Sequence, residues 1–374
     1  MEKYTYLRYQ YRIYLNSTQR KQDAAPAGCC RFVYNYYLNF RSFAWNVQRR
    51  SMNYNSCAND LKYLKLVFTW LKDADSMALQ ETLKDLQKGF DSFFAGNAKY
   101  PQFKTKKQSG HSYRTRNQNN GIRLSADEKY IHLPKLDWVK IKLTRPVPGK
   151  IENATIIRKP SGKYFISLTV KIPTSELMGT NNGEEHGLDL GIKSLYTLED
   201  GTKAENIKTL RKYERKLTRA QRRLSRMKKG SRNFIKQKRK VARLHEKITN
   251  IRHDHLHQES TKLARECSLL CIEDLNIKGM VRNHHLAQVI SDASWGAFTK
   301  MLEYKMSLHG GTLVKVSRFF ASTQTCHICG YKNPKAKDLS VREWTCPECG
   351  TLHDRDVNGA ACLLAEGKRI LSTA

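Results

Sequence analysis

The stretch SLLCIEDLNIKGM, residues 268–280, places Glu273 and Asp274 at the end of an apolar run that is typical of a buried strand. Carboxylates seldom lie beside such strands unless a cation or a hydrogen-bond network compensates their charge. Two interpretations follow: the acids emerge into a solvated loop, or they face a metal ion. Of the two acids we favour Glu273 as the ligand, because it directly follows the apolar Ile272, whereas Asp274 is expected to face the next loop.

The overall charge of the chain indicates a polyanionic partner. Its 374 residues contain 67 Lys and Arg against 34 Asp and Glu, which gives a formal net charge of +33. The excess is spread over much of the chain, so nucleic acid is the favoured partner. The alternatives are a basic protein without special affinity and a protein that binds a membrane surface. With 40% hydrophobic residues the chain is expected to fold, into two or three domains.

The sequence carries no sign of export or membrane insertion. No apolar segment of the kind found in secretion signals follows Met1, and no window approaches 18 uninterrupted apolar residues. We therefore expect a cytosolic protein without membrane contact, in which thiols stay reduced.

The N-terminal half is predicted to be a small β barrel that is interrupted by helices. Residues 9–15 alternate apolar and polar positions, which indicates a strand. From about residue 18 the pattern becomes helical and rich in aromatic residues, and strand patterns return after a polar, basic connector. The segments that flank Pro160 are predicted to form a hairpin. We assign residues 1–17 and 121–178 to the barrel and residues 18–120 to the helical insertion.

The C-terminal half, residues 179–374, combines strand and helix patterns. GLDLGIKSLYTLEDG, residues 187–201, indicates two strands in a hairpin, and a basic helical hairpin is expected over residues 205–262. Apolar residues with a 4-3 spacing, from Tyr213 to Met227 and again from Val241 to Ile251, predict a narrow apolar seam between its two helices. Residues 211–252 contain 18 Lys and Arg but only two acids. A solvated charged face is the usual explanation, but the one-sided charge favours phosphate contact. The cations that we expect to touch nucleic acid are Arg222, Arg223, Lys228 and Lys229.

Four cysteines predict a metal site in residues 321–353. CHICG begins at Cys326 and CPECG at Cys346, so two Cys-x2-Cys pairs are separated by sixteen residues, which is a zinc-ribbon spacing. Four thiolates complete a tetrahedron without an open position, so the Zn²⁺ should be structural. Chance pairing and a redox dithiol are the alternatives. The expected ligands are Cys326, Cys329, Cys346 and Cys349.

The residues that follow these cysteines extend the prediction. Gly330 and Gly350 stand where each knuckle is expected to need a positive φ. His327 and His353 are expected to lie at the surface or to face a substrate, because four sulfur atoms already fill the coordination shell.

Three acids predict a second metal site. Asp189 lies in GLDLG, Glu273 ends a strand, and Asp356 lies in HDRDVNGAACLL, where a loop enters a helix. The predicted elements follow the order of an RNase H-like fold: hairpin strands, a helical excursion, a strand that ends in Glu and a late Asp on a helix. In that fold the three carboxylates converge. Their repulsion would raise their pKa values unless divalent cations bind. Oxygen ligands suit Mg²⁺ or Mn²⁺, and two such ions support phosphodiester cleavage.

Each acid taken alone has an ordinary explanation. Asp189 fits a turn, Asp356 fits a helix N-cap, and Glu273 fits a loop carboxylate. Asp354 is the main competitor of Asp356, and we favour Asp356 because it leads directly into Val357. The order of the three acids, with the cysteine motif between the second and the third, is what favours the metal site.

The motifs GLDLGIK, IEDLNIKGM, CHICGYKNP, WTCPECG and HDRDVNGAA resemble the nuclease half of the TnpB family, transposon-encoded RNA-guided endonucleases related to type V CRISPR effectors. YRIYLNSTQ, GCCRFVYN, YPQFKTKK and LPKLDWVKIKL extend the resemblance over nearly the whole chain. It implies a wedge barrel interrupted by a helical recognition domain, followed by a RuvC-type nuclease domain that carries the zinc ribbon. It also implies catalytic acids at Asp189, Glu273 and Asp356.

The resemblance further implies partners and an activity. A transposon-end RNA would serve as guide, a short target-adjacent motif would be read on duplex DNA, and both strands would be cut with Mg²⁺. The protein would be a bacterial or archaeal one in the cytoplasm, near the nucleoid, with a monomer favoured. Two departures stand out: Gly359 replaces the usual Ala and is expected to loosen the helix start, and Pro26 interrupts the first recognition helix.

Base-reading residues and the exact function stay open at this point. Tyr54, Gln80 and Asn119 are candidates for contacts near the motif, since Gln and Asn pair bidentately with adenine; ordinary helix and loop residues are the alternative. A transposase or integrase with the same acids is one competing function. A nuclease-dead RNA-guided DNA-binding regulator is the other, although it would be expected to have lost an acid.

Overall fold

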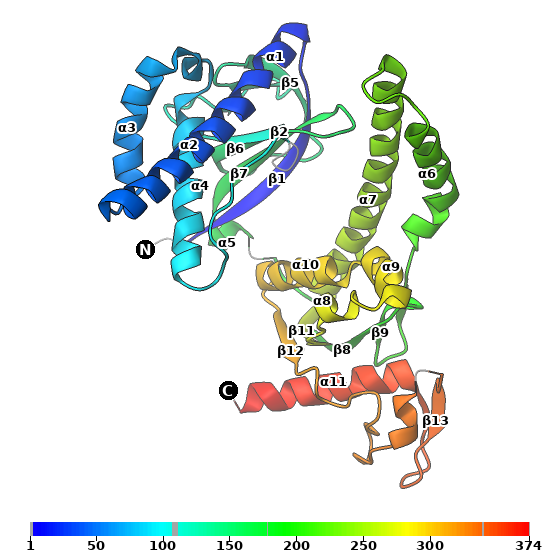
Figure 1. The fold of residues 1–374 in the computed structure, drawn as a ribbon. Helices are drawn as coiled ribbons and strands as arrows, with labels where there is room; N and C mark the ends of the chain where they lie inside the picture. The colour runs from blue at the N-terminus through cyan, green and yellow to red at the C-terminus, as the bar shows by residue number, and fades with distance from the viewer. Residues whose placement is uncertain (1–2, 107–110, 178, 339, 374) are drawn as a thin grey trace. The chain divides into compact units, whose positions relative to one another are not determined.

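The computed structural model describes residues 3–106, 111–177, 179–338 and 340–373 (Figure 1). The chain divides between Glu176 and Leu177 into two compact units, each with a sheet of its own. The short helix α5 (Thr174–Leu177) lies at this division.

The first unit is built on a seven-stranded antiparallel sheet with the strand order β2-β6-β7-β1-β5-β4-β3. β1 lies in the middle and pairs with β7 from Tyr4 to Ile13. Every second residue of β7 is buried, so one face of the sheet is packed against apolar side chains. The strands are β1 (Tyr4–Tyr14), β2 (His111–Arg116), β3 (Arg123–Leu124), β4 (Tyr130–Leu133), β5 (Asp137–Lys142), β6 (Lys150–Arg158) and β7 (Tyr164–Pro173).

This sheet differs from the expected barrel in two respects. Among the described residues the ladder begins at β2 and ends at β3, so hydrogen bonds do not close it into a ring. β3 has only two residues, which offers little backbone for closure. In addition, β2 falls within residues 18–120, where helices are predicted, yet it pairs with β6 along its whole length. The hairpin expected around Pro160 is present as β6 and β7.

The helical insertion lies between β1 and β2. Its elements are α1 (Ser17–Gln22), α2 (Ala24–Gln48), α3 (Tyr54–Val67), the 3-10 helix η1 (Thr69–Asp73) and α4 (Ser76–Phe94). The break expected near Pro26 is confirmed: α1 ends before Asp23, and the proline occupies the first turn of α2, where its missing N–H costs no hydrogen bond. α4 buries Leu79, Leu83 and Leu86 on one face.

The second unit is built on a five-stranded mixed sheet with the order β10-β9-β8-β11-β12. β8, β9 and β10 are joined by antiparallel pairing, whereas β11 runs parallel to both β8 and β12. The expected hairpin and the LLCIE strand are confirmed as β8–β9 and β11. The strands are β8 (Glu184–Leu190), β9 (Ser194–Leu198), β10 (Lys203–Glu205), β11 (Cys267–Glu273) and β12 (Thr312–Val316), with a separate pair formed by β13 (Glu343–Thr345) and β14 (Leu352–Asp354).

Along the chain, a helical hairpin connects the antiparallel strands β8, β9 and β10 to the parallel strand β11. Leu217 and Ala220 of its first helix pack against Val241 and Ile248 of its second, which is the apolar seam that the sequence predicts. The helices of the unit are α6 (Thr209–Ser225), α7 (Arg232–Glu266), α8 (Ile277–Met280), α9 (His284–Ala293), α10 (Trp295–Leu308), the 3-10 helix η2 (Pro334–Lys337) and α11 (Arg355–Ser372).

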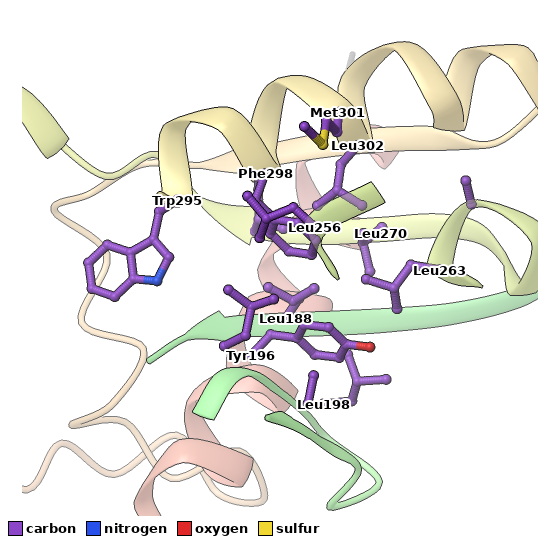
Figure 2. Close-up of a cluster of buried hydrophobic side chains, with 14 of the residues drawn as sticks. Leu188, Tyr196, Leu198, Leu256, Leu263, Leu270, Trp295, Phe298, Met301 and Leu302 are labelled. Atoms are coloured by element: carbon purple, nitrogen blue, oxygen red, sulfur yellow. The ribbon is translucent and has the colours of Figure 1, made fainter. Parts of the chain in front are cut away.

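The main core of the second unit lies between the sheet and helices α7 and α10 (Figure 2). Tyr196 on β9 stacks on Phe298 of α10 with ring centroids 5.9 Å apart. On the other face, α11 packs against Cys271 and Val314 through Leu364. The sheet is therefore covered on both faces, which explains why β11 has a nearly continuous apolar sequence.

All ten cysteines are free thiols. No described helix combines the length and the apolar character that a membrane span requires.

Candidate metal centres at the end of the second sheet

Two glycines allow helix α11 to lie directly on the sheet. A Cβ on Gly187 of β8 would come within 1.8 Å of the carbonyl oxygen of Ala360 on α11, and a Cβ on Gly367 would lie 2.1 Å from Sγ of Cys271 on β11. Neither position accepts a side chain without movement of the helix or the strand. The close approach places the first turn of α11, with Asp356, near the end of β8.

The three predicted acids come from neighbouring elements. Asp189 lies near the end of β8, and Glu273 is the last residue of β11. Leu188 pairs with Ile272 in the parallel ladder, so the next residue on each strand is one of the two acids. Asp356 is the second residue of α11.

Electrostatics shows that these carboxyl groups lie close enough to interact. The pKa of Asp189 is raised to about 8, chiefly by burial and then by the negative charges of Asp356 and Glu273, while Arg355 and Arg342 act in the opposite direction. Burial also raises the pKa of Glu273. Each acid retains partial exposure to solvent. The negative charges of Asp356 and Glu273 thus disfavour ionisation of Asp189, and a bound cation would relieve this repulsion.

The acids are more widely spaced than the cysteines. A compact metal-binding group has at least three Cys, His, Asp or Glu residues whose ligand atoms lie within 4.8 Å of one another. In the described parts of the chain, only the four cysteines meet this condition. Partly buried oxygen donors that repel one another nevertheless fit a hard divalent cation such as Mg²⁺. Closer approach of the three carboxylates without such an ion would raise their mutual repulsion.

The competing acids have partners of their own. Asp274 forms an ion pair with Arg318. Asp354 is the N-cap of α11: its Oδ1 accepts hydrogen bonds from the backbone N–H groups of Asp356 and Val357, at 2.9 and 3.2 Å. Its Oδ2 also lies 2.8 Å from Lys203 Nζ. Burial opposes ionisation, but the Lys203 bond and the two N–H donors keep the pKa of Asp354 below its usual value. The N-cap role considered for Asp356 therefore belongs to Asp354.

The four cysteine sulfur atoms have the spacing of a tetrahedral site. Cys326 Sγ lies 3.6 Å from Cys349 Sγ, and Cys329 Sγ lies 3.5 Å from Cys346 Sγ. Sulfur atoms about 2.3 Å from a central ion would be about 3.8 Å apart, so the cluster is consistent with Zn²⁺. The ligand set is closed, because four thiolates leave no position for a substrate.

Both knuckles fold in the same way. The backbone N–H of Gly330 donates to the carbonyl of Cys326, and that of Gly350 donates to Cys346, each at 2.9 Å. The two glycines have φ values of 79° and 70°, as the sequence predicts. No Cβ would be obstructed there, so the positive φ alone selects glycine.

His353 is not at the surface as expected. It is 2% exposed, its Nε2 lies 3.1 Å from Cys326 Sγ, and its ring packs on Trp344. An N–H donor at that distance stabilises a thiolate without binding the ion. Trp344 stands directly opposite His353 in the β13–β14 pair, and an aromatic residue on such a ribbon favours a second ring across it, which is the sequence signal for this packing.

Asn358 ties the cysteine ribbon to α11, a contact that sequence reasoning missed. Its buried amide donates to the carbonyl of Thr325 at 2.7 Å and accepts from the backbone N–H of His327 at 3.1 Å. These bonds flank Cys326. Because Asn358 follows Asp356 by two residues, the ribbon and the third acid share one rigid connection. A polar residue in the otherwise apolar run after HDRDV is the sequence signal for it.

The three residues that we expect to contact bases do not form one cluster among the described residues. Tyr54 begins α3 and Gln80 lies on α4; Lys84, one turn further along α4, has its Nζ 5.8 Å from the Tyr54 ring centroid. Asn119 lies in the turn after β2 with φ of 50°. Within the described residues, no hydrogen bond or ring contact joins it to the other two.

The helical hairpin has a strongly basic face. A hollow of about 860 Å³ on α6 includes Arg222 and Arg223 in its lining, together with three further arginines and a single acid, Glu214. Lys228 and Lys229 lie in the turn between α6 and α7, which begins beyond Ser225. All four predicted cations are thus on or next to one end of the hairpin.

Comparison with protein families matches three parts of the chain. Residues 167–284 match a family described as "Probable transposase", of IS605 OrfB type. Residues 295–363 match the "Cas12f1-like, TNB domain", which includes the four cysteines, and residues 1–50 match a "Helix-turn-helix domain" of IS605 OrfB type.

Whole-chain relatives extend these matches. A "Putative RNA-guided DNA endonuclease" of Streptomyces pristinaespiralis is 38% identical over 96% of this chain and 89% of its own length. A "Putative RNA-guided DNA endonuclease InsQ" of Escherichia coli K12 is 34% identical over 92% of this chain and 88% of its own.

Solved structures share the fold. A Cas12f1 structure, determined as a complex with sgRNA and target DNA, aligns with a TM-score of 0.51 and 11% identity over 97% of this chain and 99% of its own. The mini-RNA-guided endonuclease CRISPR-Cas_phi3 aligns with a TM-score of 0.54 and 9% identity over 98% of this chain and 92% of its own. This chain is thus a mixed α+β, multidomain protein with a Cas12f-like fold.

Proposed function

Because this chain belongs to the IS605 OrfB/TnpB family, we propose that it is an RNA-guided endonuclease that cleaves double-stranded DNA next to a short target-adjacent motif. The observation that carries the proposal is the effect of the Asp356 and Glu273 charges on the pKa of Asp189, at one end of the second sheet. Acids of that kind, in a protein with a net charge of +33, suit hydrolysis of a polyanion rather than binding alone.

The fold supports a RuvC-type assignment for residues 179–374. An antiparallel β8-β9-β10 meander continued by two parallel strands, in the order β10-β9-β8-β11-β12, is the arrangement expected of an RNase H-like sheet. We assign residues 1–17 and 121–178 to a wedge domain and residues 18–120 to a helical recognition domain. Strand β2, inside the latter range, belongs with the wedge sheet.

Asp189, Glu273 and Asp356 would hold two Mg²⁺ or Mn²⁺ ions, which would activate a water molecule and stabilise the leaving oxygen of the phosphodiester. The chain's own residues prepare this site. Burial around the Asp189 carboxyl lowers the local dielectric constant, which strengthens its interaction with a cation. Arg342, 3.6 Å from Asp356, supplies positive charge at the edge where a phosphate would approach.

The four cysteines would hold a structural Zn²⁺ ion that keeps the ribbon folded. The ribbon is small and has a core of only a few side chains, including Ala336 and Trp344, so metal binding would supply much of its stability. Through Asn358 the same ribbon fixes the start of α11 and hence Asp356.

Guide RNA and target DNA are the proposed partners. The basic end of the helical hairpin, with Arg222, Arg223, Lys228 and Lys229, would contact phosphates without reading bases. Tyr54, Gln80 and Asn119 stay proposed contacts near the target-adjacent motif. Base pairing of the guide would read the remaining target sequence, as in other RNA-guided nucleases. We propose a monomer as the working form.

The test begins with sequencing of the RNA that copurifies with the protein. A plasmid that carries the matching target is then incubated with the complex and Mg²⁺. We expect both strands to be cut by the unaltered protein and by Asp200→Ala, a matched loss of an acid at the β9–β10 turn. Asp189→Ala should retain RNA and lose cleavage, and cutting at the unaltered rate by this variant would contradict the assigned site.

The same assays separate the two competing functions. A nuclease-dead regulator would retain RNA and bind the target but leave the plasmid intact under all metal conditions. A transposase or integrase would carry no specific RNA and would join DNA ends instead of only cutting them. RNA copurification together with Mg²⁺-dependent cutting would exclude both.

A further inference from the structure

We propose that a hollow between α2 and the C-terminal end of α4 binds an unpaired nucleobase of a single-stranded nucleic acid. The inference rests on the proposed function, which supplies such strands, and it assigns them a binding site in the helical part of the first unit. The hollow has a volume of about 540 Å³. Its lining includes Arg41, Trp45, Arg50, Phe93, Phe94 and Tyr100.

One wall of the hollow is a cluster of aromatic rings. Phe93 contacts Phe94 and Tyr100 with ring centroids 5.3 Å apart in both pairs, and the buried Phe90 contacts the same two rings from below. Phe94 exposes 75% of its surface and Tyr100 exposes 40%. Buried Phe90 thus anchors a ring cluster in which Phe94 and Tyr100 are exposed to solvent, and exposed rings of this kind are what bases stack on.

Trp45 of α2 lines the same hollow and is 52% exposed. Within the described residues, its ring makes no ring–ring contact with the Phe93 cluster, so that cluster does not cover the indole. Exposed aromatic surface of this extent is unfavourable in water and marks a binding site when several rings gather. Aromatic faces contributed by two helices suit a flat ligand.

The charge around the hollow selects an anionic strand over an apolar protein segment. Arg41 lies 4.0 Å from the ring centroid of Phe90, and Arg49 lies 5.9 Å from that of Trp45. Arg49 occupies the left-handed region, with φ of 50°, at the C-cap of α2, and the chain turns there so that Arg50 lines the hollow. No acidic residue is part of its lining. Guanidinium groups that contact phosphate beside stacked bases are typical of single-strand recognition.

The experiment uses the full chain freed of copurifying nucleic acid and a short single-stranded RNA with 2-aminopurine at its centre. The emission of this base analogue falls when it stacks, so the readout reports the base and not only the phosphates. We expect Trp45→Ala and Phe94→Ala to weaken binding about fivefold or more and to reduce the quenching. Trp45→Phe should restore most of both.

Phe43→Ala is the matched control, because Phe43 is also on α2 and 55% exposed but does not line the hollow. It should leave affinity and quenching unchanged. A second RNA has an abasic site in place of the analogue. The unaltered chain should bind this abasic RNA more weakly than the intact RNA. Phe94→Ala should bind the two RNAs equally well. DNA of the same sequence shows whether the base comes from a guide or from a displaced DNA strand.

Two results would overturn the proposal. In the first, the unaltered chain binds intact and abasic RNA equally well, and Trp45→Ala and Phe94→Ala change nothing; the proposed function would then stand without this site. In the second, Trp45→Ala abolishes a concentration-dependent dimer and leaves RNA affinity unchanged, so the hollow is a self-association surface. Failure of the unaltered chain to bind any nucleic acid would instead contradict the proposed function itself.

Discussion

Gly187 on β8 and Ala360 on α11 touch backbone to backbone: a Cβ on the glycine would lie 1.8 Å from the alanine carbonyl oxygen. This contact sets the distance between the strand that carries Asp189 and the helix that carries Asp356. The packing of one glycine therefore determines how close these two distant acids lie.

We predict that Gly187→Ala displaces α11 from the sheet. The variant should lose several kcal/mol of unfolding free energy or fail to accumulate as soluble protein, since the contact involves backbone on both sides. Thermal unfolding measures the effect. Gly28→Ala is the control: it lies within α2 with no atom within 4 Å of its Cβ, and it should stabilise the protein by about 1 kcal/mol. An unchanged melting temperature for Gly187→Ala would contradict the packing.

Gly359→Ala should be tolerated, although the sequence suggested that this glycine loosens the helix start. Its Cβ would lie 3.3 Å from Thr323 Cγ2 and 3.7 Å from Asp189 Oδ2, so only a small shift of the threonine is needed. Alanine also favours the helix by about 1 kcal/mol. Stability and plasmid cleavage should therefore stay near those of the unaltered protein, and a large loss of either would show that the backbone needs glycine there.

The metal-free protein should become less stable as pH rises toward about 8. Asp189 has a pKa raised from 3.8 to about 8 in the folded state, so the folded chain binds its proton more tightly than the unfolded chain does. This contribution to stability is complete below the pKa that Asp189 has in the unfolded chain. It is lost as pH rises through the pKa that Asp189 has in the folded chain. Asp189→Asn should flatten this dependence. Denaturant titrations with chelator between about pH 5 and 9 test it, and parallel curves for both proteins would refute the shift.

Asn358→Ala should loosen the connection between the cysteine ribbon and α11. It removes a buried amide that bonds to Thr325 and His327, and the orphaned backbone groups should cost about 1–3 kcal/mol. We expect one Zn²⁺ per chain to remain, but to exchange faster with a chelator. Asn333→Ala, which removes an exposed cap of η2 in the same ribbon, should exchange zinc at the unaltered rate. Equal rates for both variants would contradict the link.

Cys346→Ser should abolish zinc binding and unfold the ribbon. The thiolate is one of four that would complete the shell of a Zn²⁺ ion, and a ribbon with so small a core would depend on that ion. Elemental analysis should find less than one Zn²⁺ per chain, and proteolysis should cut between residues 321 and 353 first. Cys57→Ser, a buried thiol in α3, should keep the ion. Full zinc occupancy in Cys346→Ser would show that the cysteines do not act as a set.

Paired removal of Arg222 and Arg223 should lower the salt dependence of nucleic-acid binding. Each phosphate contact contributes about 0.9 to the slope of log K against log salt on duplex DNA. In the double alanine variant, the magnitude of that slope should therefore fall by up to about 2. The fall should be the same for every nucleic-acid sequence. Arg369→Ala controls for charge, because Arg369 is already paired with Glu366. A slope that falls equally in both would indicate a general charge effect.

The sequence by itself determined the local structure and the donor sets. Alternation along β1, the 4-3 spacing of the hairpin seam and the two Cys-x2-Cys pairs each reflect contacts among residues near in the chain or fixed by chemistry, so they were predictable. The choice of Asp189, Glu273 and Asp356 came from the order of motifs and from family resemblance, and the structure brings them within electrostatic reach.

Only the tertiary structure decided how these parts meet. The open ladder of the first sheet, the burial of His353 against Cys326 and the amide link from Asn358 to Thr325 depend on packing between segments far apart in sequence. Close packing is set by shape in three dimensions, and a glycine or an asparagine in a sequence does not reveal which backbone it will touch. Asp354 illustrates this: its motif fits a metal ligand, and its geometry makes it a helix cap.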